Sequence, residues 1–163
     1  FKKGLHSEYR INKLLQQNNI NAKWTANDKK TPGDFETNCG LYLDAKSSIG
    51  NSVWQFNIVN IGRPHHVIDF FLCETIKDDS IDVFIFPFDS PIIMGTNSGI
   101  SLSARQDKKG AYVDYKNNLN LIKTRINPHL NNEPSWIDVV EQSRANLNHR
   151  IKENMTANSH HDI

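Results

Sequence analysis

The sequence predicts an α/β fold in which one mixed β-sheet is flanked by helices. Three observations carry this prediction. Apolar side chains recur at helical spacing in the first 18 residues, short apolar runs of strand type fill the middle, and helical spacing returns in the last third. The sequence contains no internal repeat and no linker, so we expect a single domain over residues 1–153 and a disordered tail over residues 154–163.

The elements follow from local patterns. Apolar residues spaced three or four apart predict a helix over residues 4–18, which Asn18 and Asn19 end. Residues 23–30 are polar and short, which indicates a connection. Residues 31–48 are typical of a β-hairpin with a glycine-containing turn. The alternation over residues 53–58 predicts a further strand, with a short helix as the alternative.

Two continuous apolar runs, residues 68–76 and 81–88, come next. Runs of this kind suit strands that are covered on both faces, in the middle of a sheet. Residues 100–103 fit a short edge strand. Helical spacing returns over residues 112–124 and again from residue 135 onward, which gives the helical last third.

Composition excludes several classes of protein. With 37% hydrophobic residues the chain is not expected to be disordered, and we find neither an apolar run of about 20 residues nor a signal-peptide pattern. Cys39 and Cys73 lie within or beside apolar runs, and we expect both to be reduced core residues of a cytoplasmic protein.

The net charge of +1 conceals a segregation of charge along the chain. Residues 1–30 and 104–126 are basic, whereas residues 69–90 are acidic. Such a chain can present a face that binds a polyanion. The alternative is that these charges are scattered over loops and only keep the chain in solution.

The hairpin carries charged residues where a half-buried strand favours uncharged ones. Residues two apart share one face of a strand, so Tyr42, Asp44 and Lys46 point one way and the apolar residues between them point the other. Asp34, near the start of the partner strand, can converge with Asp44. Two close carboxylates repel each other unless a cation neutralises them, and Mg²⁺ suits carboxylate and phosphate oxygens. With Lys46 beside them, this arrangement indicates hydrolysis of a phosphodiester.

Pro32-Gly33-Asp34 followed by Asp44-Ala45-Lys46 resembles the P-D…(D/E)-x-K signature of restriction-endonuclease-like nucleases. The segment G-L-H-S-E-Y-R-I-N-K-L-L upstream places Glu8 where that family commonly has an acidic residue on its first helix. The two apolar runs after the motif look like later core strands of small members, which extends the similarity to about residue 90. The sequence departs from the pattern in its intervening glycine, in Asp44 where glutamate is frequent, and after residue 95, where nothing matches.

This resemblance implies a restriction-endonuclease-like sheet, a Mg²⁺ site in which Mn²⁺ substitutes, and no organic cofactor. It implies that Asp34 and Asp44 are metal ligands and that Ala45 donates a backbone carbonyl to the same ion. Lys46 would assist the attacking water, and Glu8 would bind the metal directly or through water. Each residue has an alternative: Asp34 as a turn residue, Asp44 and Lys46 as a solvated strand face, and Glu8 as helix support.

The resulting hypothesis is a metal-dependent DNA endonuclease that cuts specific duplex sequences, of restriction or homing type. A Holliday-junction resolvase is one alternative, and a catalytically inactive DNA-binding module on the same fold is another. Duplex cleavage requires two sites, so we expect a homodimer or a higher symmetric oligomer. Asn-rich loops such as those at Asn51 and Asn97 are candidates for base readout. Phosphate contacts are predicted for Lys3, Lys23, Lys29, Lys30, Arg105, Lys108 and Lys109, with Lys116 and Arg125 as further candidates.

Overall fold

The computed structural model describes residues 2–25, 30–58, 67–95, 99–104, 112–128 and 136–157. The chain divides into two compact units, residues 1–122 and 123–163. All the residues that the structure shows as buried lie in the first unit, so the core and the candidate site belong to it.

Helix α1 (Lys2–Gln17) opens the first unit. Its apolar stripe buries Ile11 and Leu15 completely or almost so. The helix ends where Asn19 adopts a positive φ of 59° and the Ile20 N–H donates to the Leu15 carbonyl at 2.9 Å. The predicted first helix is therefore confirmed.

A five-stranded mixed sheet with the strand order β1-β2-β3-β5-β6 forms the centre of this unit. Its strands are β1 (Ala22–Trp24), β2 (Phe35–Thr37), β3 (Tyr42–Ile49), β5 (Phe70–Lys77) and β6 (Ser80–Pro87). β3 and β5 are parallel, and every other neighbouring pair is antiparallel. The predicted α/β class with a mixed central sheet is confirmed. The prediction that residues 23–30 only connect elements was wrong for its start, because β1 pairs with β2 at the edge.

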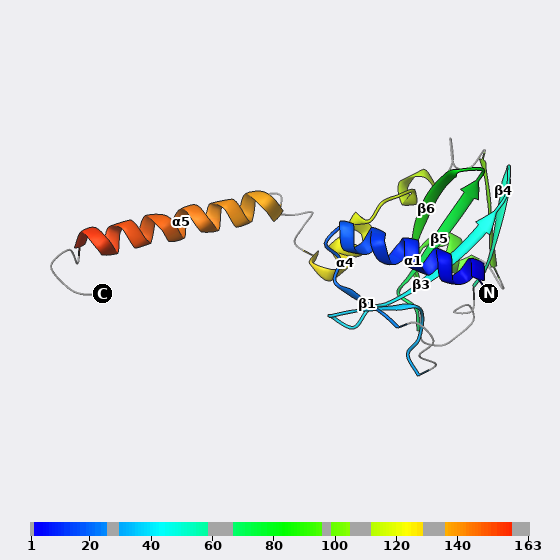
Figure 1. Cartoon of the computed structure of the whole chain (residues 1–163), viewed down its shortest axis with the longest axis horizontal. Helices are drawn as coiled ribbons and strands as arrows, with labels where there is room; N and C mark the ends of the chain where they lie inside the picture. The colour runs from blue at the N-terminus through cyan, green and yellow to red at the C-terminus, as the bar shows by residue number, and fades with distance from the viewer. Residues whose placement is uncertain are drawn as a thin grey trace. The chain divides into compact units, whose positions relative to one another are not determined.

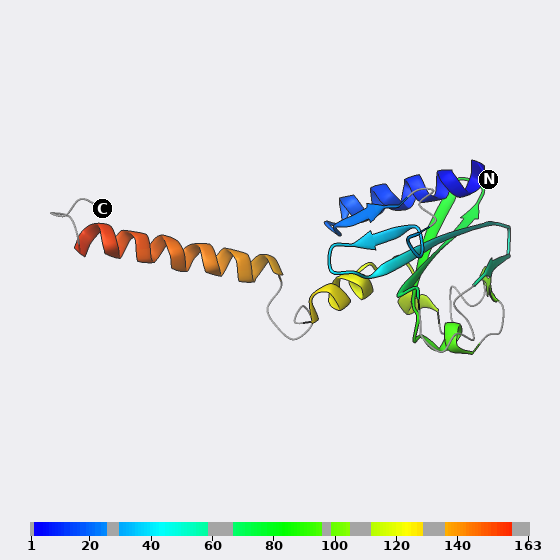
Figure 2. The same cartoon turned by 90° about the horizontal axis from the view of Figure 1, so that it is seen from below.

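A second sheet of two antiparallel strands, β4 (Val53–Asn57) and β7 (Gly99–Ser103), covers part of the first. We call it the β4–β7 ribbon. The short helix α2 (Pro91–Met94) precedes β7 in the chain. Helix α1 lies along one face of the five-stranded sheet and the ribbon lies on the other (Figures 1 and 2).

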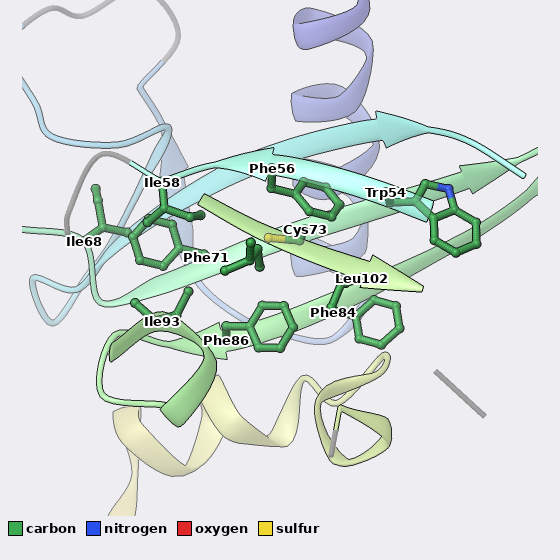
Figure 3. Packing of buried hydrophobic residues seen from close by; sticks show 11 residues of the cluster. Trp54, Phe56, Ile58, Ile68, Phe71, Cys73, Phe84, Phe86, Ile93 and Leu102 are labelled. Atoms are coloured by element: carbon green, nitrogen blue, oxygen red, sulfur yellow. The ribbon is translucent and has the colours of Figure 1, made fainter. Parts of the chain in front are cut away.

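The core on the ribbon side is an aromatic and aliphatic cluster (Figure 3). The ribbon contributes Trp54, Phe56, Ile100 and Leu102, and the sheet contributes Phe71, Cys73, Phe84 and Phe86. Because side chains alternate along a strand, the neighbouring residues of β5 point to the opposite face, where α1 lies. The sheet is thus covered on both faces, and β5 is buried along most of its length.

Strand β5 is central, as predicted, but β6 is at the edge of the sheet, so its predicted central position was wrong. At the outer edge of β6, Asn117 forms hydrogen bonds with the backbone of Val83. Its N–H donates to the Val83 carbonyl at 2.6 Å, and its Oδ1 accepts the Val83 N–H at 2.8 Å. Asn117 has a φ of 54°, which a helix does not allow. The helix predicted over residues 112–124 is therefore split into a 3₁₀ turn η1 (Val113–Tyr115) and helix α4 (Asn120–Ile126).

Helix α5 (Trp136–Ala157) makes up most of the second unit and runs through the predicted boundary at residue 153. Its side chains Leu147, Ile151 and Met155 are exposed. Residues 158–163 of the predicted tail lie outside the described residues. In the part of the chain that the structure describes, no helix is both long and apolar enough to cross a membrane.

Both cysteines are free thiols. Cys73 is completely buried in the cluster, as predicted. Cys39 is exposed in the turn between β2 and β3, so its predicted place in the core was wrong. The turn residue Gly40 next to it has a φ of 88°, and this turn directs the Cys39 side chain to the surface.

Candidate active site

The Pro-Gly-Asp turn brings Asp34 against β3. Gly33 has a φ of 71°, and a Cβ at this position would lie 2.7 Å from the Leu43 carbonyl oxygen, so only glycine fits. The Asp34 N–H donates to that same Leu43 carbonyl at 2.8 Å. The Thr25 hydroxyl lies 3.1 and 3.0 Å from the carbonyl oxygens of Gly33 and Asp34 and ties the turn to the end of β1.

The carboxyl group of Asp34 is held by two neighbours. Its Oδ2 accepts the Ala45 N–H at 2.8 Å, and it shares a hydrogen bond with the carboxyl group of Asp44. Burial, reinforced by this hydrogen bond and by the charge of Asp44, raises the pKa of Asp34 from 3.8 to about 8. The charge of Glu8 adds a smaller increase, and the Ala45 N–H opposes the shift. At neutral pH the Asp34 carboxyl group therefore keeps its proton.

Lys46 completes the group. It lies two residues after Asp44 on the same face of β3, and its Nζ is 3.1 Å from Asp44 Oδ2. The Lys46 side chain is 26% exposed, whereas that of Asp44 is 11% exposed, so the ammonium is the more accessible partner. Beneath them lies Cys73, which pairs with Lys46 in the register; burial raises the pKa of its thiol far above the usual range.

Glu8 lies near this group without belonging to it. Its Oε1 accepts the indole N–H of Trp24 at 3.0 Å, and its negative charge contributes to the raised pKa of Asp34. Over the described ranges, no three His, Cys, Asp or Glu side chains lie close enough together to hold a metal ion. The structure thus brings Asp34, Asp44 and Lys46 together and does not bring Glu8 into the same cluster. Sequence reasoning missed Trp24, which gave no signal in a polar segment.

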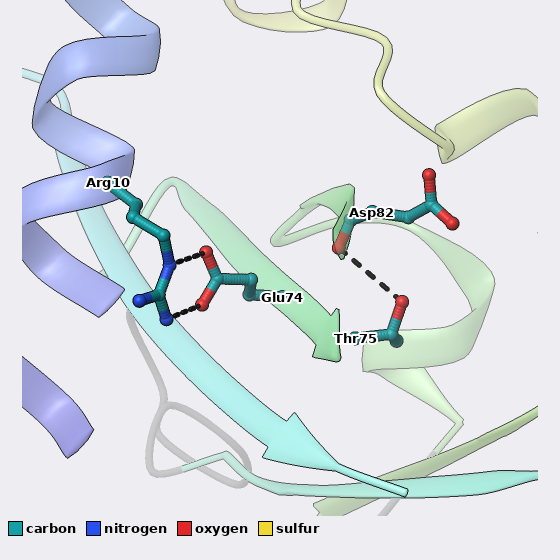
Figure 4. Close-up of polar contacts among 4 residues, drawn as sticks. All are labelled: Arg10, Glu74, Thr75 and Asp82. Atoms are coloured by element: carbon teal, nitrogen blue, oxygen red, sulfur yellow. Dashed lines mark hydrogen bonds and ion pairs between the residues drawn. The ribbon is translucent and has the colours of Figure 1, made fainter. Parts of the chain in front are cut away.

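An ion pair fixes the helix that carries Glu8 (Figure 4). Arg10 Nε and Nη2 donate to the two oxygens of Glu74 at 2.9 and 2.7 Å, and Glu74 is only 1% exposed. The hydrogen bond to Glu74 raises the pKa of Arg10 further above its ordinary value. On the other face of β5, the Thr75 hydroxyl donates to the Asp82 carbonyl at 3.4 Å. The glutamate inside an apolar run was the only signal of this pair in the sequence.

The predicted phosphate-binding residues are described only in part. Lys23 is exposed on β1, where it is opposite Glu36, and Lys30 is exposed just before the Pro-Gly-Asp turn. Lys3 belongs to the first turn of α1. The Lys116 ammonium lies 3.6 Å from Asp82. Arg125 belongs to the last turn of α4. Lys29, Arg105, Lys108 and Lys109 lie outside the described residues, as does Asn97.

The oxygen atoms of this site suit a hard divalent cation. Carboxylate and carbonyl oxygens are the ligands that Mg²⁺ and Mn²⁺ prefer. The N–H and the carbonyl of one strand residue point to the same side, so the Ala45 carbonyl faces the side from which Asp34 approaches. The raised pKa of Asp34 means that this carboxyl group keeps a proton at neutral pH. A metal cation can take the place of that proton.

Comparison with known proteins gives one structural likeness. No protein-family model matches the chain, and no curated protein sequence matches it. Among solved structures, the chain is similar to a bacterial homing endonuclease, I-Ssp6803I, with a TM-score of 0.49 and 19% sequence identity over 74% of this chain and 90% of that chain. At this identity the likeness says nothing about the roles of individual residues.

Proposed function

We propose that the chain is a metal-dependent DNA endonuclease of the PD-(D/E)XK type that hydrolyses phosphodiester bonds in specific duplex sequences. The observation that carries this proposal is the Asp34–Asp44 carboxyl pair, held by the Ala45 N–H and flanked by the Lys46 ammonium 3.1 Å from Asp44. Placing two partly buried carboxyl groups in contact destabilises a fold, so their presence beside a partly exposed lysine favours a functional role.

In this proposal Asp34, Asp44 and the Ala45 carbonyl would hold Mg²⁺ or Mn²⁺, and Glu8 would bind the ion directly or through water. When bound, the cation stabilises negative charge on the phosphate as a Lewis acid. Asp34 must lose its proton to serve as a ligand, so binding is tighter above its pKa of about 8 than below it.

Lys46 acts on the substrate itself. Asp44 holds its ammonium in place by the 3.1 Å ion pair, and its partial exposure lets it reach a phosphate at the surface. From there it orients the attacking water and donates a hydrogen bond to the charge that develops on the phosphate oxygen. A neutral or shorter side chain at this position cannot do so.

Nicking of supercoiled plasmid tests the proposal. With Mg²⁺ we expect the wild type to nick, EDTA to abolish nicking, and Asp44→Asn and Lys46→Ala each to lower the rate at least about 100-fold. Lys77, at the end of β5, and Asp79, in the turn that follows, are both exposed. Lys77→Ala and Asp79→Asn are therefore the matched controls and should leave the rate unchanged. Unchanged nicking by Asp44→Asn and Lys46→Ala would remove this site from the chemistry. Tight DNA binding with no cleavage in Mg²⁺ would indicate an inactive DNA-binding module.

Cleavage of both strands requires two such sites. We propose a homodimer or higher symmetric oligomer, because a symmetric assembly places one site on each strand of a symmetric target. Sedimentation of the chain with duplex DNA checks this. A complex with a single copy of the chain that still produces double-strand breaks would contradict it.

A further inference from the structure

The outer face of the β4–β7 ribbon is mainly polar, is exposed or half-exposed along its length, and carries no charged residue. The inner residues of the ribbon are buried in the aromatic cluster, and every second residue points away from it. This outer face comprises Val53, Gln55 and Asn57 on β4 and Gly99, Ser101 and Ser103 on β7. The face therefore combines amide and hydroxyl groups with no carboxylate that would repel a polyanion.

The pairing register makes the two amides project. Gln55 lies opposite Ser101, and Asn57 lies opposite Gly99, so each long side chain has a small neighbour across the ribbon. At Gly99 a Cβ would lie 2.5 Å from the Phe56 carbonyl oxygen, so the close approach of the two strands excludes any side chain there. Gln55 and Asn57 thus form a ridge along β4.

We propose that this ridge enters the major groove of double-stranded DNA and that Gln55 and Asn57 read base edges there; the inference rests on the endonuclease function proposed above. The major groove is about 12 Å wide and admits a two-stranded β-ribbon. Side chains two residues apart on a strand lie about 6.7 Å apart, which matches two base-pair steps of about 3.4 Å. Amide side chains make paired hydrogen bonds to adenine.

The ribbon is held in a fixed place relative to the candidate site. β4 follows β3 after a short turn at residues 50–52, and the Gln55 N–H donates to the Ser48 hydroxyl at 3.1 Å. Ser48 lies two residues after Lys46 on β3. A base read by Gln55 therefore lies at a set distance along the duplex from the phosphate that Lys46 contacts. These residues join the loops at Asn51 and Asn97 as candidates for base readout.

Selection from a random pool of DNA duplexes tests this inference. The full chain is used with Ca²⁺ to reduce cleavage, and bound duplexes are sequenced for the wild type, Gln55→Ala, Asn57→Ala and Gln16→Ala. Gln16 is an exposed glutamine on α1 and serves as the matched control. We expect Gln55→Ala and Asn57→Ala each to lose about tenfold in base discrimination, at positions about two base pairs apart, while Gln16→Ala keeps the wild-type preference.

A charge variant keeps the inference testable should the alanine variants prove unstable. Gln55→Glu is nearly the same size, and its carboxylate should weaken binding to every DNA duplex at least about tenfold, whereas Gln16→Glu should not. Binding to an RNA duplex should be unaffected, because its deep, narrow major groove excludes the ribbon.

Four results would overturn the inference. Unchanged base preference in both alanine variants would do so, as would a change in the oligomeric mass of Gln55→Glu without DNA, which would make this face an interface between copies. Plasmid nicking that depends on Asp44 and Lys46 but shows no base preference would overturn the role of the ribbon and the proposed sequence specificity, and would leave the proposed catalytic site intact. A chain that neither binds nor nicks duplex DNA would overturn both proposals.

Discussion

Asp34 combines a partly buried carboxyl group with a hydrogen-bonded acidic neighbour, and this gives it a proton at neutral pH. This proton reduces the negative charge of a site that its surroundings do not fully neutralise. Lys46 neutralises Asp44 through a direct ion pair, whereas Asp34 is held by the neutral N–H of Ala45 and by the carboxyl group of Asp44. The site therefore has room for one more positive charge, beside Asp34.

The pH dependence of stability follows from this proton. The folded chain keeps it up to pH about 8, whereas in the unfolded chain the group titrates near 3.8, so folding takes up a proton between these values. The free energy of unfolding should therefore fall as the pH rises through this window. One proton limits the slope to about 1.4 kcal/mol per pH unit, and solvent screening reduces it further. Urea unfolding from pH 5 to pH 8 should show a flatter dependence in Asp34→Asn. An equal dependence of the unfolding free energy on pH in wild type and variant would contradict a protonated Asp34 in the folded chain.

Gly33 determines where the Asp34 carboxyl group lies. Gly33→Ala should lower the free energy of unfolding by at least about 2 kcal/mol, because it adds a steric clash with the Leu43 carbonyl to an unfavourable positive φ. Gly40→Ala separates the two effects, since Gly40 also has a positive φ but open space around its Cβ position, and should lose about 1 kcal/mol. Urea midpoints measure both. Equal losses would mean that the contact with β3 contributes nothing.

Helix α1 is attached to the sheet by the Arg10–Glu74 ion pair, which spans 64 residues of sequence. Removal of Arg10 leaves an almost completely buried carboxylate without its partner, so Arg10→Ala should lower the free energy of unfolding by about 3 kcal/mol. The more exposed Lys116–Asp82 pair is the control, and Lys116→Ala should lose less than about 1 kcal/mol.

The double variant Arg10→Leu with Glu74→Leu distinguishes an unpaired charge from lost packing. It should recover most of the stability that Arg10→Ala loses, because two apolar side chains leave no buried charge behind. Thermal and urea unfolding check this. A double variant as unstable as Arg10→Ala would show that the guanidinium contributes by packing rather than by pairing with Glu74.

Elements with a strong local pattern were predictable from the sequence. The apolar spacing of α1, the hairpin of β2 and β3, and the continuous run of β5 each determine their structure within one segment. β1 was not, because a three-residue strand in a polar stretch depends on its pairing with β2. The break in the predicted helix at Asn117 could not be predicted either, because it depends on hydrogen bonds to the edge of β6, more than 30 residues away in the sequence.

The candidate site divides in the same way. The approach of Asp34 to Asp44 and Lys46 follows from strand alternation and one short hairpin, and so it could be predicted. The contacts of Glu8 with Trp24 and of Arg10 with Glu74 join separate elements, and no local pattern specifies them. The outer face of the ribbon, which we propose reads bases, could not be predicted from the sequence, because the pairing of β4 with β7 crosses about 45 residues of sequence.

The molecule as a whole places its core and its candidate site in one of two units. Every side chain described as buried precedes Lys123, and the described side chains of α5 from residue 143 to residue 155 are exposed. A chain that ends at residue 128 should therefore keep a cooperative thermal transition within about 4 °C of the full chain. Scanning calorimetry measures this. Loss of the transition would mean that α5 contributes to the stability of the first unit.

Calorimetric titration of Mn²⁺ into the full chain near pH 7 tests most directly whether the Asp34–Asp44 pair binds a divalent cation. We predict binding that releases close to one proton, seen as a heat that changes with the ionisation enthalpy of the buffer, because Asp34 must give up its proton. Asp34→Asn should bind more weakly and release none, and Asp79→Asn should behave as wild type. Mn²⁺ binding of unchanged affinity and proton release in Asp34→Asn and Asp44→Asn would contradict the proposed site.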